Sequence, residues 1–324
     1  MMKVSELYHQ ADARLGNAEN PKRLALVHTA IALGASFLLT LINYLFSLMI
    51  ADTGGLSGLG ARSALSTLQT LLELGVMVAL PFWQLGIFYA ALRWAKGESA
   101  TFSDLLQGFR RFVSGLGLLF LQISLFIALS TIVIYACTIL FMMTPFSDPL
   151  TEILAPIMEQ AATSEQLAEL MTPELMESVG QATIPLAILS GVLFAAVAIA
   201  AYYRVRFANF ALMEGLTSGK AMIKSFTVTK RSFWKVLKID LSFWWFYLLQ
   251  GLSVAICNGD LFLSYLGISL PVSGITATIL FYGMGCICQC LLLWQYEAKR
   301  VTVYGLAYRT LTGITTPDTA EETA

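Results

Sequence analysis

Six long apolar stretches dominate this sequence and leave it few ways to fold. They lie near residues 24–50, 69–94, 113–144, 182–213, 239–258 and 274–296. About 20 residues of α-helix cross the hydrocarbon core of a bilayer, so each stretch is long enough to span it. Because lipid offers no hydrogen-bond partner, every backbone amide must be bonded within its own segment. The sequence therefore predicts an all-α polytopic membrane bundle of six transmembrane helices within residues 24–310.

The composition argues against an enzyme. Only 13% of the residues are charged, against roughly 25% in soluble domains. The sequence has two histidines and no GxSxG, Walker A, HExxH or GxGxxG pattern. We therefore expect no catalytic residues, no cofactor and no nucleic-acid partner.

The cysteines do not predict a metal site. Cys286, Cys288 and Cys290 form the motif CICQC, the one metal-like spacing in the sequence. Cys286 and Cys290 would share a helix face, but two thiols hold copper or zinc only with further ligands, and no histidine lies nearby. We interpret these cysteines as small apolar residues of a span.

The distribution of cations predicts the orientation. Of the 20 Lys and Arg residues, 19 lie in the four segments that six spans leave on one side, and only Arg62 lies on the other. Cationic loops stay preferentially in the cytoplasm. Both termini are therefore expected to be cytoplasmic, including a tail at 311–324 that we expect to be disordered.

The loop at 145–181 has the opposite character, with no Lys or Arg and seven acids. The acids are Asp148, Glu152, Glu159, Glu165, Glu169, Glu174 and Glu177. Thr163 with Gln166, and Thr172 before Pro173, predict two helix starts. We expect two short helices on the outer face, either as a solvated cap or as a vestibule that gathers cations.

Three cytoplasmic segments show an amphipathic helical pattern that predicts interfacial helices. The first lies in residues 1–23, where Val4, Leu7, Tyr8, Ala11 and Leu15 share a face. In the second, Thr101 and Asp104 form a capping box before Phe102, Leu105, Leu106, Phe109 and Phe112. In the third, Met222, Ile223 and Phe226 oppose Lys220 and Lys224.

The third segment carries the strongest functional hypothesis, a basic and aromatic surface that binds anionic lipid or a protein partner. Its members are Lys220, Lys224, Lys230, Arg231, Lys235 and Lys238, with Trp234, Trp244 and Trp245 as interfacial anchors. Each cation near an anionic membrane surface contributes roughly 1 kcal/mol. A topology signal alone would produce the same cluster, so both interpretations stay open.

Polar residues within the spans give the alternative, a small transporter. Asp240 has no well-placed cation on its own helix, so Arg204 or Arg206 is its expected partner. This pair could be a structural ion pair, a solvated group, or a proton or substrate site. Pro81 predicts a kink beside Gln84, and both could line a path.

Four segments resemble a known family. They are ADARLGN (11–17), FYAALRWAKGESATFSDLLQGF (88–109), YYRVRFANFALMEG (202–215) and SFTVTKRSFWKVLKIDLSFWWFYLL (225–249). Together they resemble a bacterial integral-membrane family, common in Firmicutes, that is number nine hundred and seventy-five among the domains of unknown function. Arg231 stands where that family has glycine. The resemblance implies a six-span protein of the bacterial plasma membrane without a known enzymatic role or cofactor.

Overall fold

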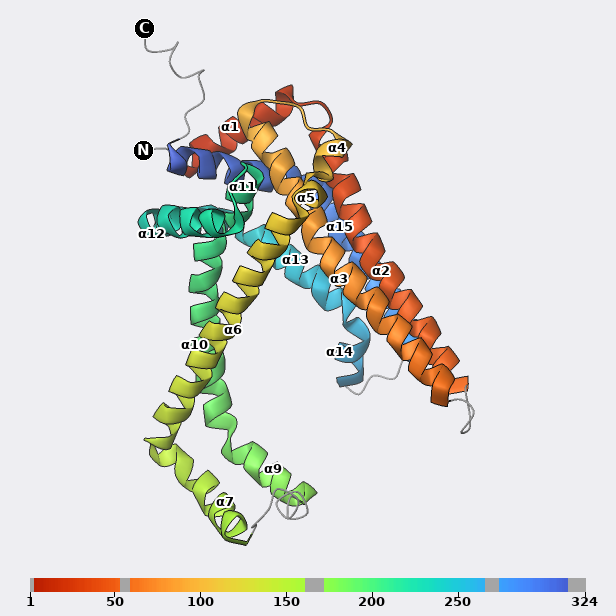
Figure 1. Cartoon of the computed structure of the whole chain (residues 1–324), viewed down its shortest axis with the longest axis vertical. Coiled ribbons are helices and arrows are strands. Elements are labelled where there is room, and N and C mark those ends of the chain that lie inside the picture. Colours follow the sequence, from red (N-terminus) through yellow and green to blue (C-terminus); the bar gives the residue numbers. More distant parts are fainter. Residues whose placement is uncertain (1–2, 53–58, 161–171, 266–273, 314–324) are drawn as a thin grey trace. The chain divides into compact units, whose positions relative to one another are not determined.

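The computed structural model describes residues 3–52, 59–160, 172–265 and 274–313, and these residues form α-helices and one short 3-10 helix (Figure 1). The chain divides into two compact units. Unit 1 comprises residues 1–119 and 206–324, and unit 2 comprises residues 120–205. The predicted all-α class is confirmed for the described residues.

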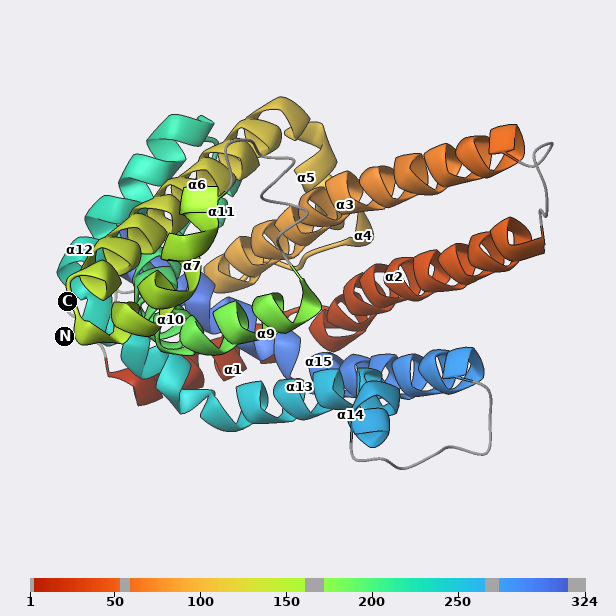
Figure 2. The ribbon, with the colours of Figure 1, turned by 90° about the horizontal axis from the view of Figure 1, so that it is seen from below.

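Unit 1 is built on three long apolar helices. They are α2 (Pro21–Asp52), α3 (Leu59–Lys96) and α15 (Gly274–Thr312), which lie side by side in both views (Figures 1 and 2). The helix α15 contacts α2, α3 and also α13 (Trp244–Cys257). Proline at the start of α2 suits the first turn, where its missing N–H leaves no hydrogen bond unmade.

Five described helices are long and apolar enough to cross a bilayer, and a bent pair of helices would make a sixth span. Besides α2, α3 and α15, they include α6 (Phe112–Met142) and α10 (Ile184–Val205), the latter extended by α11 (Ala208–Met213). The described helices therefore indicate a multi-pass membrane protein.

The fifth span differs from the prediction of one helix over 239–258. The helix α12 (Ser218–Ser242) ends just before Phe243, and α13 leaves it at an angle of 60°. With 14 residues, α13 is about 21 Å long, shorter than the ~30 Å core. After a break at Asn258 the chain continues as α14 (Gly259–Tyr265). The bend separates a helix with six Lys and Arg residues from the apolar segment that follows.

The last helix is longer than the predicted span 274–296. It continues to Thr312, so residues 297–312 add four turns that carry charged and tyrosine side chains. Much of this extension is buried in unit 1, including Val303, Tyr304 and Tyr308. The predicted tail 311–324 is thus helical at its first two residues, and residues 314–324 lie outside the described part.

Smaller helices cover one end of unit 1. In α1 (Val4–Asn17), Leu7 and Ala11 are buried, as its apolar pattern predicts. The second amphipathic segment instead forms two four-residue helices, α4 (Phe102–Leu105) and α5 (Gln107–Arg110). The backbone of this segment lies very close to α3: a Cβ on Gly86 would lie 1.9 Å from the Leu105 carbonyl oxygen. The predicted capping box of Thr101 and Asp104 is present.

Unit 2 contains most of α6 and all of α10, and the acidic loop connects them in sequence. In this loop α7 (Asp148–Gln160) follows a 3-10 turn (Pro145–Ser147) and contacts α9 (Pro173–Ala182). The Thr172 hydroxyl accepts a hydrogen bond from the Leu175 N–H at 3.3 Å, which confirms the predicted start of α9. The other predicted start, Thr163 with Gln166, lies outside the described residues.

Candidate functional site

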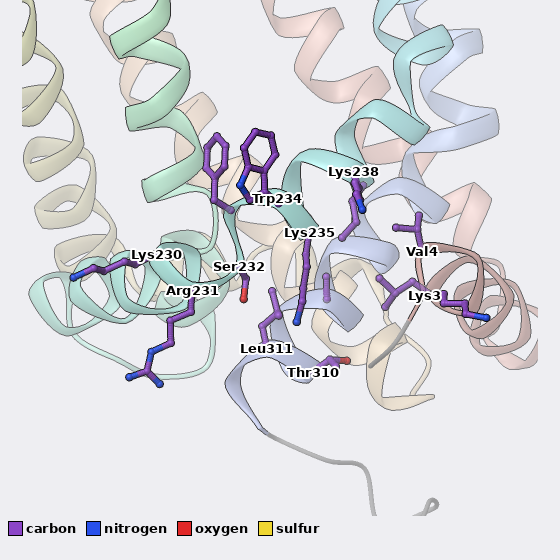
Figure 3. Close-up of a pocket in the computed structure, with 14 residues that line it drawn as sticks. Lys3, Val4, Lys230, Arg231, Ser232, Trp234, Lys235, Lys238, Thr310 and Leu311 are labelled. Atoms are coloured by element: carbon purple, nitrogen blue, oxygen red, sulfur yellow. The ribbon is translucent and has the colours of Figure 1, made fainter.

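A basic groove of about 640 Å³ lies on unit 1, where α1, α12 and the end of α15 meet (Figure 3). Its cations are Lys3, Lys230, Arg231, Lys235 and Lys238, and none of its 14 described lining residues is acidic. Figure 3 shows Lys230 and Arg231 toward one end and Lys3 at the other, with Lys235 and Lys238 between them. Its remaining surface is mainly apolar, with contributions from Leu7, Phe233 and Leu311. We call this the basic groove.

The pattern of small and apolar residues in α12 decides which of its faces carry the cations. One stripe of the helix is buried, at Ala221, Ser225, Thr229, Ser232, Val236, Ile239 and Asp240. This spacing of three and four residues marks a single helix face. Two of its hydroxyl residues are hydrogen-bonded: Ser225 Oγ accepts from the Phe207 N–H at 3.1 Å, and Thr229 Oγ1 donates to the Ser225 carbonyl at 2.8 Å. The cations therefore occupy the remaining faces.

The helix α12 is not straight beside the groove. Ser232 has φ −130° and ψ 15°, which departs from helical geometry and kinks α12 within its length. A second hollow of about 550 Å³ shares Arg231 and Lys235 with the basic groove and adds Lys224 and Thr312. The cations thus continue from one concave surface to the next.

Two of the predicted lysines are not part of the basic groove. Lys224 lies against Glu214, with Nζ 3.2 Å from Oε2, and its Nζ is 5.3 Å from the centre of the Tyr308 ring. Its charge is therefore compensated within the fold. Lys220 is exposed on the first turn of α12 and lines neither of the two hollows.

The three predicted tryptophan anchors have different surroundings. Trp234 lines the groove with 72% of its surface exposed, and Trp244 is 63% exposed. Trp245 instead packs edge-on against Tyr296 of α15, with ring centres 4.5 Å apart. An exposed indole next to cations suits the headgroup region of a bilayer, so Trp234 is the anchor that belongs to the groove.

Asp240 is held in a buried polar cluster at the bend between α12 and α13. Of the two predicted partners, Arg206 makes the ion pair, with Nη2 2.8 Å from Asp240 Oδ1, and the two side chains are 8% and 10% exposed. The Tyr247 and Tyr304 hydroxyls also donate to Oδ1. The Arg206 guanidinium lies 4.1 Å from the centre of the Tyr304 ring. The cluster therefore joins α12, α13, α15 and the chain before α11.

The tyrosines of this region were not predicted as site residues. Tyr304 and Tyr308 are four residues apart, so both lie on one face of α15. Tyr304 donates to Asp240, and Tyr308 donates to Glu214 Oε2 at 2.6 Å. The spacing YxxxY in VYGLAYR was the available signal, but its partners lie 64 and 94 residues away.

The residues of the transport hypothesis differ in their exposure. Pro81 is inside α3, which runs as one helix from Leu59 to Lys96. Gln84 is exposed, while its neighbours Trp83 and Leu85 are buried. The Asp240–Arg206 pair is buried, so the described residues do not place Gln84 and this pair on one surface. A polar path at Pro81 stays a prediction.

Metal binding is not indicated by the described residues. Within the described ranges, no three His, Cys, Asp or Glu side chains are grouped so that they could hold a metal ion. Cys286 and Cys290 are partly buried in α15, and Cys288 is exposed.

Comparisons with protein-family models, with curated proteins and with solved structures found no match for this chain. The family resemblance rests on the quoted motifs and stays a prediction.

Proposed function

We propose that this chain is a non-enzymatic membrane protein that binds the headgroup of an anionic phospholipid in the basic groove. The observation that supports it most is the set of five cations, without an acid among the described lining residues, around an apolar surface and beside exposed Trp234. A phospholipid presents the matching pattern, an anionic phosphate next to acyl chains. The asymmetry of Lys and Arg supports a cytoplasmic position for this groove, in the inner leaflet of a plasma membrane.

The expected strength of lipid binding follows from the charge of the groove. Near an anionic bilayer each Lys or Arg contributes roughly 1 kcal/mol, so neutralising three cations should weaken lipid binding about 100-fold. The attraction is screened over about 10 Å at 0.1 M salt, so retention should fall as salt is raised.

The test compares two variants with the same change of charge. One neutralises the groove, with Lys230→Gln, Lys235→Gln and Lys238→Gln. The control neutralises three exposed lysines outside it, with Lys22→Gln, Lys96→Gln and Lys220→Gln. Native mass spectrometry from nanodiscs with phosphatidylglycerol and phosphatidylcholine then reads the lipid retained by each protein.

We expect retained phosphatidylglycerol to be lost in the groove variant and kept in the control. Equal retention in both variants would contradict a specific site and leave the cations as a topology signal. A co-purified protein that is lost only from the groove variant, with lipid unchanged, would instead favour a protein partner.

A further inference from the structure

The last turn of α15 forms part of the wall of the basic groove. Thr310 and Leu311 line this groove, and Thr312 lines the adjoining hollow. Gly313 follows with φ +73°, the left-handed conformation that ends a helix and redirects the chain. The described chain therefore ends at Gly313, two residues after Leu311 of the groove lining.

The segment 314–324, ITTPDTAEETA, has the charge that the groove lacks. It contains Asp318, Glu321 and Glu322 and no Lys or Arg. The groove contributes five cations and no acid from its described lining residues. This complementarity is local, because the chain as a whole has a net charge of −1.

The chain length is sufficient for contact. Eleven residues reach at most about 36 Å, and Asp318, five residues after Gly313, reaches up to about 17 Å. The cations from Lys230 to Lys238 are spread over about 12 Å of helix. A short tether of this kind gives a millimolar effective concentration.

We propose that the acidic segment 314–324 occupies the basic groove and competes there with the anionic lipid headgroup. The competition rests on the proposed lipid function, whereas the contact itself does not. Exposed ion pairs are individually weak, so the segment occupies the groove only in part and a membrane rich in anionic lipid displaces it. The segment thereby makes lipid binding depend on the charge density of the bilayer.

The contact can be tested on the unmodified full chain in neutral detergent. A carbodiimide joins carboxylates directly to amines that they touch, and peptide mass spectrometry locates the links. We expect links from Asp318, Glu321 or Glu322 to Lys3, Lys230, Lys235 or Lys238, and we expect phosphatidylglycerol to suppress them. Mixing 15N-labelled with unlabelled protein separates links within one chain from links between chains.

The competition is tested with a neutral segment, Asp318→Asn, Glu321→Gln and Glu322→Gln. Its affinity for phosphatidylglycerol, by native mass spectrometry, should rise by about threefold or more, as expected when a tethered competitor is removed. The matched control removes three exposed acids from unit 2, with Asp148→Asn, Glu152→Gln and Glu177→Gln. This control should leave the affinity unchanged.

The outcomes separate the two proposals. Links in the groove without phosphatidylglycerol binding by any variant would support the segment's contact and overturn the lipid function and the competition. Lipid binding without links, and with equal affinity in the neutral segment, would overturn the role of the segment and keep the lipid function. Links that form only between chains would overturn the contact within one chain and indicate that the segment binds the groove of a second copy of the protein.

Discussion

Replacing Asp240 by asparagine tests whether the buried cluster at the α12–α13 bend stabilises the fold. The substitution keeps the shape of the side chain and removes the charge that faces Arg206 at 2.8 Å. Because both side chains are at least nine-tenths buried, water compensates little for the lost partner. Breaking such a pair typically costs about 3–5 kcal/mol.

The geometry places the expected value toward the lower end of that range. The Arg206 guanidinium stays over the Tyr304 ring, and a desolvated cation–π contact contributes about 2 kcal/mol. The Tyr247 and Tyr304 hydroxyls can still donate to the amide oxygen of the asparagine. We therefore expect Asp240→Asn to lower the free energy of unfolding by about 3 kcal/mol.

The assay is unfolding by SDS titration in mixed micelles, followed by tryptophan fluorescence, on a double-mutant cycle. Arg206→Gln should also be costly, and the double variant should lose less than the sum of the single losses, by about 2 kcal/mol. Asp12→Asn is the control, because its partner Lys299 lies at the same distance, 2.8 Å, and both side chains are more exposed. Its cost should stay below about 1 kcal/mol. A loss for Asp240→Asn no larger than for Asp12→Asn, or strict additivity in the cycle, would refute the reasoning.

Two further predictions concern packing and pH. Gly86→Ala should lower the free energy of unfolding by about 3 kcal/mol, because the new Cβ meets the Leu105 carbonyl oxygen; Gly34→Ala, which meets nothing within 4 Å, should change it little. Melting temperatures by fluorescence-detected size exclusion compare the two, and equal shifts would contradict the close approach of α3. Burial raises the pKa of Tyr8 above its usual 10.0, and its hydroxyl lies 2.8 Å from Ser242 Oγ. Below about pH 10 the phenol is protonated in both the folded and the unfolded state. Above about pH 10 the unfolded state loses the proton first, so the stabilisation that the Tyr8 hydroxyl contributes is present below about pH 10 and declines above it. The stability difference between the wild type and Tyr8→Phe should therefore shrink as the pH rises above about 10, and a constant difference would show that Tyr8 does not contribute to it.

The sequence by itself determined the all-helical class of this protein and the position of most of its long apolar helices. Hydropathy is a local sum, and lipid requires each backbone to satisfy its own hydrogen bonds, so the apolar stretches predict helices without knowledge of the packing. The start of α9 at Thr172–Pro173 was also predictable, because helix capping depends only on residues that are neighbours in sequence. The partner of Asp240 was narrowed to two arginines, because a carboxylate at that position is costly without a cation.

Only the tertiary structure decided the features that join distant segments. The structure pairs Arg206 with Asp240 and brings the Tyr247 and Tyr304 hydroxyls to the same carboxylate. It also ends α12 at Ser242, before the 60° bend to α13. The residues of the cluster are far apart in sequence, so no local pattern predicts their contacts. The basic groove has the same origin: Lys3, Lys235 and Leu311 lie more than 70 residues apart in sequence and meet only when α1, α12 and α15 pack together. Periodicity within one helix gives the face on which a cation lies, whereas the surface opposite to it is fixed by packing between helices.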